Sequence, residues 1–410
     1  MTYPMQKYYP LEGIRVLGLE QYIAGPDCTM WLADQGAEVI KIERPGSGDP
    51  RRNYLPEVED KDGNKAYGGF EVFNRNKKSL SLNIQSEKGK ALFKELIKHT
   101  DVIVENMAPG TIEKLGLGYD VLKEINPRLI YAAISGFGRL DELKGPYSNW
   151  PAFDPVIQAM AGIMDLIGEE GKPPLWGFPG LADMFTGVVT GYAILLALFM
   201  RERTGEGQFI DSSMYDSLVA LNEMGIMTYS FSGEILSRGS VLRFQAPAGA
   251  YQLKDGSYVA FLAANDFIWK RFCKAIERED LIENPKTATG PERVRNKDFL
   301  EPIVQEWMVS RDRKEVVGTL LRNGVPVGPV QNAEDLVHCP HLKARQMLVQ
   351  IEHPIAGKRV YAKSPIRMTK AKDVPTRPSP TLGEHTDAIL KDLLNYDNGT
   401  IQGLRNEDVI

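Results

Sequence analysis

The chain has 410 residues, which is long enough for two or three domains of ordinary size. Its residues are 43% hydrophobic and 25% charged, as in folded globular proteins, so the composition excludes a disordered or fibrous protein. Lys and Arg number 49 against 54 Asp and Glu, a net charge of −5 without a long basic block, so nucleic acid is not an expected partner.

The cysteines and the first residues indicate a reducing compartment. Cys28, Cys273 and Cys339 are far apart and form no CxxC pair, so we expect neither a disulfide framework nor a metal site. The first 30 residues lack a charged segment followed by an apolar one, so no signal peptide is expected. These features predict a cytoplasmic protein without a bound metal.

Residues 14 to 134 alternate short β-branched runs with segments of helical period, which predicts a parallel α/β sheet. The strand-like runs are IRVLGLE, AEVIKIE, SLSLN, DVIVE and LIYAAIS, and the helical ones include DCTMWLADQ and SEKGKALFKELIKHT. Ser86 stands where a helix N-cap would, and Pro109 stands where a first helical turn begins.

Four loops follow these strands, and their small residues let the backbone approach a ligand closely. In an open parallel sheet the ligand crevice lies outside the carboxyl ends of the strands, so the loops would form one binding cleft. Ordinary turn chemistry explains the same Gly, Pro, Asn and Asp residues without a ligand. No GxGxxG follows the first strand, so a standard dinucleotide site is not expected. The loops are QYIAGPD (21–27), ERPGSGDP (43–50), ENMAPG (105–110) and SGFG (135–138).

Asp183 stands directly ahead of 17 uncharged residues that end at Met200. The stretch is too short for a membrane span and contains Thr and Gly, so it predicts a helix buried in protein and no membrane partner. Asp183, Gly187 and Gly191 share one helix face, which would leave a narrow groove up to the acid while the bulky side packs in the interior. Asp183 is then either an N-cap or a nucleophilic or acid–base carboxylate in a water-poor pocket, and the pattern alone does not separate these interpretations.

The chain changes character after the strand-like QFIDSS and the helix that follows it. AYQLKDGSYVAFLAAN predicts a β-hairpin around Asp255-Gly256, and helical periods follow near 266–278, 298–309 and 312–322. These elements indicate a smaller α+β domain. The expected divisions of the chain are 1–225, 240–330 and 331–410.

Eight segments, in this order and spacing, resemble the family III CoA-transferases. This family includes formyl-CoA:oxalate and carnitine-type CoA-transferases, with the 2-methylacyl-CoA racemases as a sister branch. The resemblance extends over nearly the whole chain. The segments are PLEGIRVLGLEQYIAGP (10–26), AEVIKIERPGSGDP (37–50), FNRNKKSLSLN (73–83), VENMAPGTIEKLGLGYDVLKEINPRLIYAAISGFG (104–138), PGLADMFTG (179–187), RTGEGQFIDSSM (203–214), NGVPVGPV (323–330) and LGEHT (382–386).

The resemblance implies an α/β fold and an activity. The N- and C-terminal parts would build a Rossmann-like large domain with a parallel sheet, beside the smaller α+β domain. Two chains, identical or paralogous, would interlock as a dimer. The implied enzyme is a CoA-transferase that moves CoA from an acyl-CoA, succinyl-CoA being a common donor in the family, to an organic carboxylic acid. Coenzyme A is then a substrate, and no permanently bound cofactor is implied.

Nine positions match the family's CoA contacts. Arg44 and Lys114 supply cations for the phosphates, and the backbone near Ala24 and Ala108 can approach the pantetheine arm. Exposed solvated charges are the alternative for both cations. The matching positions are Ile23, Ala24, Arg44, Leu82, Asn83, Asn106, Met107, Ala108 and Lys114.

Asp183 matches the family's catalytic aspartate. The resemblance implies that it attacks the donor thioester to give an acyl-aspartyl anhydride, which CoA thiolate converts to an aspartyl-CoA thioester. The acceptor carboxylate then leaves as the new thioester. A carboxylate is a poor nucleophile in water, so positioning and exclusion of water must supply much of the rate.

Three departures from the family pattern matter. Ile23 stands where some transferases have a Gln that helps to hold the intermediate. Phe153 stands where the racemases need a proton-transferring His, which disfavours racemization and leaves Asp154 a structural role. The glycine-rich loop of formyl-CoA transferases is replaced by FQAPAGAYQL (244–253), which makes oxalate doubtful as acceptor; Gln245, Tyr251 and Tyr22 line an acceptor pocket or belong to the core.

Other functional classes stay open at this stage. The chain would be an isomerase if it moved CoA between two carboxylates of one molecule, or a racemase despite Phe153. It would be a CoA-binding subunit without activity if a paralogue performed the chemistry, although Asp183 argues against that. A plain nucleotide-binding protein is disfavoured because no phosphate-binding loop is present.

Overall fold

The computed structural model describes residues 8–239, 245–263 and 265–410. Its strands are β1 (Arg15–Leu19), β2 (Glu38–Glu43), β3 (Glu57–Glu59), β4 (Lys65–Tyr67), β5 (Lys78–Ser81), β6 (Val102–Glu105), β7 (Ile130–Ser135), β8 (Phe209–Ser213), β9 (Ala248–Gln252), β10 (Tyr258–Leu262), β11 (Val327–Pro329), β12 (Leu348–His353) and β13 (Gly357–Ala362).

The helices are α1 (Ala24–Ala33), α2 (Gly68–Asn74), α3 (Glu87–Ile97), α4 (Thr111–Lys114), α5 (Tyr119–Ile125), α6 (Asp154–Met160), α7 (Ile163–Leu166), α8 (Leu181–Thr204), α9 (Met214–Leu221), α10 (Glu223–Ser232), α11 (Asp266–Ala275), α12 (Gly290–Arg295), α13 (Lys297–Val309), α14 (Arg313–Arg322), α15 (Ala333–Val337), α16 (Pro340–Ala344), α17 (Thr386–Leu394) and α18 (Asn398–Asn406). A short 3₁₀ helix, η1, spans Pro50–Asn53.

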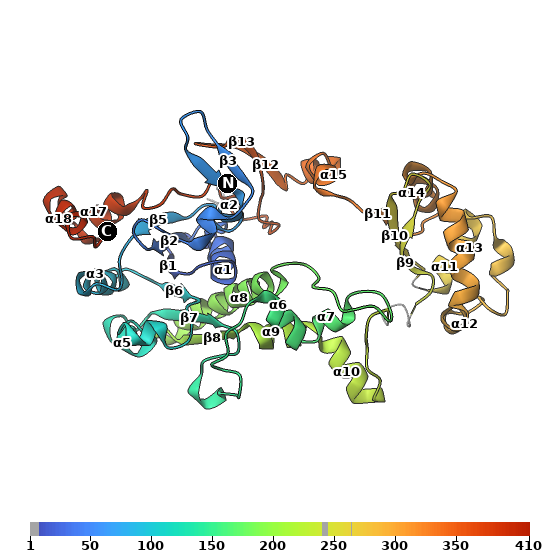
Figure 1. The fold of residues 1–410 in the computed structure, drawn as a ribbon, viewed down its shortest axis with the longest axis horizontal. Coiled ribbons are helices and arrows are strands. Elements are labelled where there is room, and N and C mark those ends of the chain that lie inside the picture. The colour runs from blue at the N-terminus through green and yellow to red at the C-terminus, as the bar shows by residue number, and fades with distance from the viewer. Residues whose placement is uncertain (1–7, 240–244, 264) are drawn as a thin grey trace, which may run out of the picture. The chain divides into compact units, whose positions relative to one another are not determined.

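Six parallel strands form the main sheet in the order β5-β2-β1-β6-β7-β8 (Figure 1). Numbered within this sheet, the order is 3-2-1-4-5-6, the doubly wound arrangement. The strands are short apolar runs because helices cover a parallel sheet on its faces. The predicted α/β fold with a Rossmann-like parallel sheet is confirmed.

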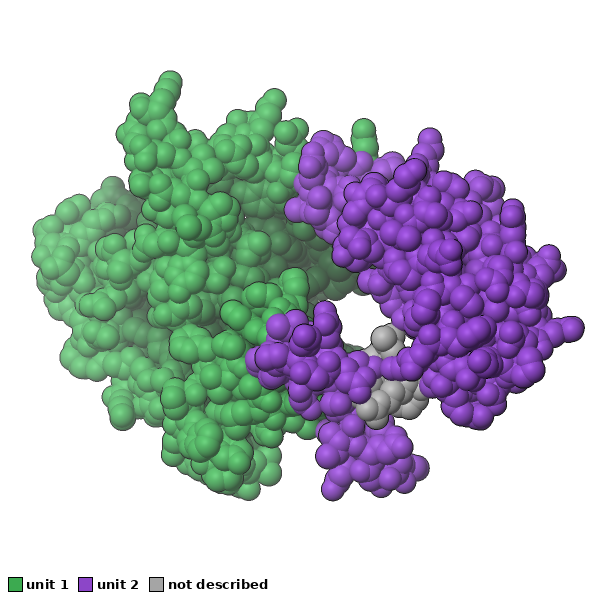
Figure 2. All heavy atoms as spheres, turned by 45° about the vertical axis from the view of Figure 1, so that its right-hand side comes forward, with its two compact units in different colours: residues 1–163, 176–223, 341–410 green, residues 164–175, 224–340 purple. Residues whose placement is uncertain are grey.

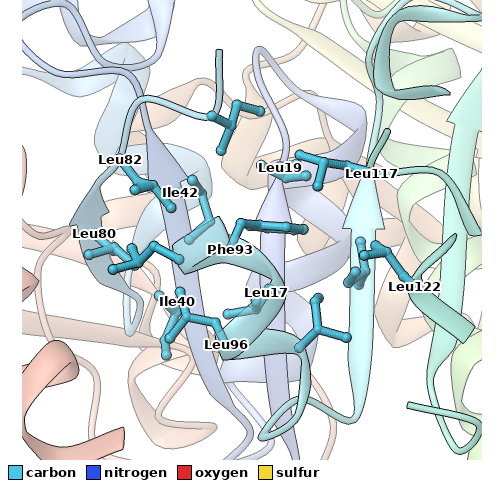
Figure 3. Packing of buried hydrophobic residues seen from close by; sticks show 14 of the residues in the cluster. Leu17, Leu19, Ile40, Ile42, Leu80, Leu82, Phe93, Leu96, Leu117 and Leu122 are labelled. Carbon is cyan, nitrogen blue, oxygen red and sulfur yellow. The ribbon is translucent and has the colours of Figure 1, made fainter. Parts of the chain in front are cut away.

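Helix α3 packs into the largest hydrophobic cluster of the sheet. Phe93 and Leu96 point from this helix toward Leu17 and Ile40 of the sheet (Figure 3). Phe93 is fully buried, which stabilises the fold by about 2 to 3 kcal/mol relative to an exposed side chain. At the start of α3 the Ser86 hydroxyl accepts a hydrogen bond from Gly89 N at 3.0 Å, so the predicted N-cap is confirmed.

The C-terminal helices belong to the same cluster. Ile389 of α17 and Ile401 of α18 are buried in it. Ser81 N of β5 donates a hydrogen bond to Thr386 Oγ1 at 3.0 Å, and Asn83 N donates to Val409 O at 2.8 Å. The C-terminal part of the chain therefore completes the large domain, as the resemblance implied.

Among the described helices, α1 and α8 have the most extensive contact with each other. A Cβ atom added at Gly187 would lie 2.9 Å from Ala24 O and 2.8 Å from Asp27 Oδ2, so the helices approach closely only because this residue is glycine. The prediction for the two faces of α8 was wrong. The face with Gly187 and Gly191 is the buried one, and many bulky residues of the opposite face, such as Leu195, are exposed in the single chain.

The chain forms two compact units (Figure 2). Unit 1 consists of residues 1–163, 176–223 and 341–410, and it contains the main sheet. Unit 2 consists of residues 164–175 and 224–340. The segments 164–175 and 331–340 thus group with the smaller unit.

Unit 2 is built on the antiparallel sheet β11-β10-β9. Strands β9 and β10 form the hairpin predicted around Asp255-Gly256, with Gly256 at φ +78° in its turn. Its core contains Trp269 and Phe272 of α11 and Trp307 of α13. The three predicted helices are confirmed as α11, α13 and α14, although α11 ends three residues earlier than expected.

Candidate active site

The strand order reverses between β1 and β6, which is the topological switch point of the sheet. The loops after these two strands therefore diverge over the crevice where ligands of such folds bind. Asn106 joins the two loops, because its Oδ1 accepts a hydrogen bond from Gln21 N and its Nδ2 donates to Gln21 O, both at 2.8 Å. Two of the four predicted ligand loops thus meet through one side chain.

Buried charged side chains hold the loop after β1 in place. Lys77 Nζ donates to Pro26 O at 2.9 Å and contacts Glu20 Oε1 at 3.2 Å, while Lys41 Nζ donates to Glu20 O at 2.7 Å. Lys41 Nζ also lies 2.9 Å from Asp49 Oδ2 of the loop after β2. Burial lowers the pKa of Lys77 to about 8, although the attraction of Glu20 opposes this shift. Paired buried charges are costly to separate, so this network holds two loops in one arrangement.

Tyr22, in the loop after β1, has a strained backbone. Its φ is +63°, a left-handed conformation that a bulky residue rarely adopts. Asp49 Oδ1 accepts a hydrogen bond from Tyr22 N at 3.3 Å, and the Tyr22 ring packs edge-on against Phe153 with centroids 5.8 Å apart. Strain of this kind persists where surrounding contacts fix it, often at functional sites.

Asp154 caps the start of helix α8. Its Oδ1 accepts a hydrogen bond from Ala182 N at 2.8 Å, and its Oδ2 accepts from Gly180 N at 3.0 Å and from Trp176 Nε1 at 2.8 Å. Gln158 Nε2 donates to both oxygens. A buried carboxylate from a different helix thus satisfies backbone donors that a helix start leaves unpaired.

Asp183 is the third residue of α8, and Gly180 occupies the N-cap position without a side-chain cap. The N-cap interpretation of Asp183 is therefore wrong, because Asp154 serves that purpose from 29 residues earlier in the chain. The Asp183 carboxylate is half-buried and is left available for chemistry at the positive end of a long helix.

The surroundings of Asp183 favour its protonated form. Burial raises the pKa of Asp183 from its ordinary 3.8 to about 7, the negative charges of Asp154 and Asp27 add to the rise, and Arg51 opposes it. Burial likewise raises the pKa of Asp27 to about 7, although a hydrogen bond from Trp31 Nε1 at 3.1 Å opposes that shift. Strongly perturbed carboxylates in a crevice are typical of catalytic sites.

Ile23 and Ala24 lie beside the catalytic candidate. The Ile23 side chain is close to the loop before α8, since a Cβ atom added at Gly180 would lie 3.4 Å from Ile23 Cδ1. Ala24 is the first residue of α1 and is buried. Phe153 is 62% exposed and has no ionisable group, so it cannot perform the acid–base step of a racemase.

The remaining predicted CoA contacts lie at the carboxyl ends of the strands. Arg44 and Lys114 are exposed, and neither forms an ion pair within the described residues. Leu82 is buried, whereas the Asn83 side chain accepts from Gln85 N at 3.1 Å and faces the C-terminus of the chain. Leu82 and Asn83 follow β5, Arg44 follows β2, and Asn106, Met107, Ala108 and Lys114 follow β6.

A hollow of about 680 Å³ opens between the loops after β6 and β7, with Gly110 and Gly138 on its wall. Arg139 borders the hollow and supports the loop after β6, because it pairs with the buried Glu105 and donates to Met107 O. The Asp211 carboxylate accepts hydrogen bonds from the backbone nitrogens of Arg139 and Leu140. The loops at 105–110 and 135–138 therefore share one cavity.

Two other candidates belong to unit 2. Tyr251 is a core residue, since it is buried and its hydroxyl donates to Glu301 Oε2 at 2.9 Å. Gln245 borders an apolar hollow of about 630 Å³ over the sheet of this unit. Among the described residues, no group of His, Cys, Asp and Glu side chains is arranged to hold a metal ion.

Sequence reasoning missed Arg51, Asp27 and Asp49. Arg51 is the cation that acts on Asp183, and Asp49 supports the loop that carries Tyr22. The one signal for Asp49 is its position in the GSGDP loop after β2. Arg51 and Asp27 stand in ordinary local patterns, and only the tertiary structure brings them to the site.

The fold and this site define an α/β enzyme with a half-buried carboxylate beside the loops at the switch point of its sheet. Comparison identifies the class further: the model of CoA-transferase family III matches residues 11–386, so the chain belongs to this family and is a CoA-transferase. The chain is 41% identical over 393 residues to succinyl-CoA:mesaconate CoA-transferase of Haloarcula marismortui, which covers 95% of this chain and 98% of the relative.

Two further comparisons agree. The chain is 35% identical over 411 residues to succinyl-CoA:glutarate CoA-transferase of Homo sapiens, covering 99% of this chain and 91% of the relative. The crystal structure of a CAIB/BAIF family protein from Brucella suis superposes with a TM-score of 0.84 at 35% identity, covering 95% of this chain and 100% of that one. The fold and the family predicted from the sequence are therefore confirmed.

Proposed function

We propose that this enzyme transfers CoA from succinyl-CoA to a dicarboxylic acid through Asp183. The observation that carries the proposal is the half-buried Asp183 carboxylate. It lies in the first turn of α8, beside the switch-point loops, and takes no part in capping the helix. The relatives named for succinyl-CoA, mesaconate and glutarate support the choice of donor and the class of acceptor.

The reaction proceeds by four acyl transfers that balance without water or a metal. An Asp183 oxygen attacks the carbonyl carbon of the donor thioester, and the C–S bond breaks. CoA thiolate departs, and a mixed anhydride of Asp183 and the succinyl group remains. The thiolate attacks the Asp183 carbonyl carbon and releases succinate, which leaves an aspartyl-CoA thioester. The acceptor carboxylate attacks the same carbon and expels the thiolate. The thiolate finally attacks the acceptor carbonyl, which yields the new thioester and restores Asp183.

The residues around Asp183 make these steps feasible. Asp154 fixes the first turn of α8, so that the nucleophile is held in one place. Ile23 and Phe153 are apolar, and they limit the access of water to the anhydride and the thioester. Arg44 and Lys114 would hold CoA phosphates, with Asn106 positioning the loop that the pantetheine arm follows.

The test uses intact-protein mass spectrometry after incubation with a panel of acyl-CoA thioesters, followed by hydroxylamine trapping and peptide mapping. We expect an adduct, and a hydroxamate after trapping, at Asp183 with succinyl-CoA. Binding of the thioesters without any covalent adduct would instead favour a subunit without activity.

The rate should depend on pH through Asp183, which must be ionised to attack. Because the Asp183 pKa is raised to about 7, we expect kcat/KM to rise about tenfold per pH unit below pH 7 and to level off above it. A rate that is constant between pH 5 and pH 8 would contradict this assignment.

The functional enzyme is a dimer in this proposal, formed by identical or paralogous chains in the cytoplasm. Helix α8 supports it: among the described helices it is the one long and apolar enough to cross a membrane, and one of its faces is exposed in the single chain. Val188, Tyr192, Leu195 and Phe199 recur on this face at helical spacing. A second chain would bury this apolar face.

The substitution Leu195→Glu tests the dimer. A charge on the exposed apolar face of α8 should oppose burial of that face, so we expect the variant to yield much less dimer in sedimentation than the wild type. Glu202→Gln, at an exposed position of the same helix, serves as the control. A wild-type protein that sediments as a monomer at micromolar concentration would contradict the proposal.

A further inference from the structure

Arg51 presents a fixed guanidinium group at the edge of the candidate active site. It lies in η1, directly after the loop that follows β2. Its Nε donates to Gly69 O at 2.7 Å, and its guanidinium carbon lies 5.0 Å from the ring centroid of Tyr54 and 5.1 Å from that of Phe73. One hydrogen bond and two aromatic faces thus orient the group, which leaves both Nη atoms available.

The charge of Arg51 is not neutralised by an ion pair. Its neighbour Arg52 pairs with Glu43 at 2.7 Å, and Arg75 pairs with Asp34, but among the described residues no carboxylate forms an ion pair with Arg51. The Arg51 side chain is half-buried, and burial lowers its pKa. A partly desolvated guanidinium without a carboxylate partner is a ready site for an anion.

Arg51 is tied to the loop that adjoins Asp183. Asp49 Oδ1 accepts hydrogen bonds from Arg51 N at 2.9 Å and from Tyr22 N at 3.3 Å, so one carboxylate connects η1 to the loop after β1. That loop carries Ile23, which lies against the loop before α8. Arg51 and Asp183 influence each other's pKa, and among the described residues the two side chains form no ion pair.

A dicarboxylic acyl group needs such a cation. One of its carboxylates becomes the thioester or anhydride at Asp183, and the other remains ionised near an apolar, half-buried site. Removing that charge from water is costly unless a fixed guanidinium receives it. We propose that Arg51 binds the distal carboxylate of the acyl group and so selects dicarboxylic over monocarboxylic substrates; this inference rests on the proposed function of Asp183.

The kinetic test compares succinyl-CoA with butyryl-CoA, whose acyl group has the same four carbons but ends in a methyl group. Rates are measured at pH 9, where Asp183 is ionised with or without the Arg51 charge that opposes its raised pKa. In Arg51→Gln we expect kcat/KM for succinyl-CoA to fall at least ~30-fold, because one partner of a partly desolvated charge pair is removed, with little change for butyryl-CoA. Lys61→Gln removes one positive charge from the exposed turn between β3 and β4, and it should leave both values unchanged.

Two kinetic outcomes would overturn the inference. An equal fall for both thioesters would show that Arg51 acts on Asp183 or on the CoA moiety that they share. Unchanged kinetics with both thioesters would show that the distal carboxylate lies elsewhere.

A binding measurement separates this inference from the proposed function. In an Asp183→Asn background, which removes the nucleophile, calorimetry gives Kd for both thioesters with and without Arg51→Gln. Tighter binding of succinyl-CoA that disappears with Arg51→Gln would support the carboxylate site even if no CoA transfer occurs in the wild type. Equal Kd values for the two thioesters in the Asp183→Asn protein with Arg51 intact would contradict the site even if transfer occurs.

Discussion

Asp183→Asn is expected to lower the rate of CoA transfer by roughly 10⁴-fold or more while the protein stays folded. An amide has nearly the shape of the carboxylate, but it cannot attack a thioester to form an anhydride. Asp183 accepts no hydrogen bond from the start of α8, so its replacement leaves the helix cap intact. Steady-state transfer from succinyl-CoA gives the rate, and circular dichroism checks the fold.

The same variant should be more stable than the wild type at neutral pH. The Asp183 pKa is about 7 in the folded protein and near its ordinary 3.8 in the unfolded chain. Between these values the folded state binds the additional proton, so the wild type loses stability as the pH rises from about 4 to 7, and the loss is complete above pH 7. Asparagine carries no charge and does not contribute this loss.

Thermal unfolding at several pH values measures the difference. We expect the Tm of Asp183→Asn to exceed that of the wild type at pH 8 and to approach it near pH 4. Asp392→Asn, at an exposed position of α17, is the matched control and should show neither effect. A variant that keeps its transfer activity would refute the nucleophilic mechanism, and a Tm difference independent of pH would refute the buried-acid account of Asp183.

The sequence predicted those features that local patterns determine. Alternating runs placed the parallel strands, Ser86 identified the start of α3, and the family segments identified Asp183 among 54 acidic residues. Each of these signals lies within a few neighbouring residues. Helix periodicity also showed that α8 has a small face and a bulky face.

The errors arose where tertiary contacts decide the outcome. Periodicity does not show which face of α8 meets α1, and Gly187 permits a close approach that leaves the bulky face exposed. Pro109 precedes the short helix α4 by two residues because Gly110, at φ +81°, occupies its N-cap. Arg51 stands in a charged segment, PRRN, and only its contacts with Gly69, Tyr54 and Phe73 distinguish it from a solvated surface cation.

Asp154→Ala is expected to destabilise the protein and to slow the reaction through the position of Asp183. The substitution leaves the buried Gly180 N and Ala182 N without their acceptor at the start of α8, which costs about 3 kcal/mol, and it also removes the acceptor of the exposed Trp176 Nε1. Asp183 follows Ala182 directly, so loosening of the first turn of α8 displaces the nucleophile. A displacement of about 1 Å lowers kcat by roughly 100-fold.

A pH profile distinguishes this positioning role from a loss of stability alone. The Asp154 charge contributes to the raised pKa of Asp183, so its removal should lower that pKa and move the acid limb of kcat/KM below its position near pH 7. Asp154→Asn removes the same charge but keeps one oxygen acceptor, so we expect the same shift with a smaller loss of stability.

Urea unfolding measures the stability of each variant, and rates are compared at temperatures where both are folded. If Asp154 only capped the helix and had no electrostatic effect on Asp183, its substitution would change the rate by the same factor at every pH. An acid limb that does not shift would therefore show that Asp154 acts only as the helix cap.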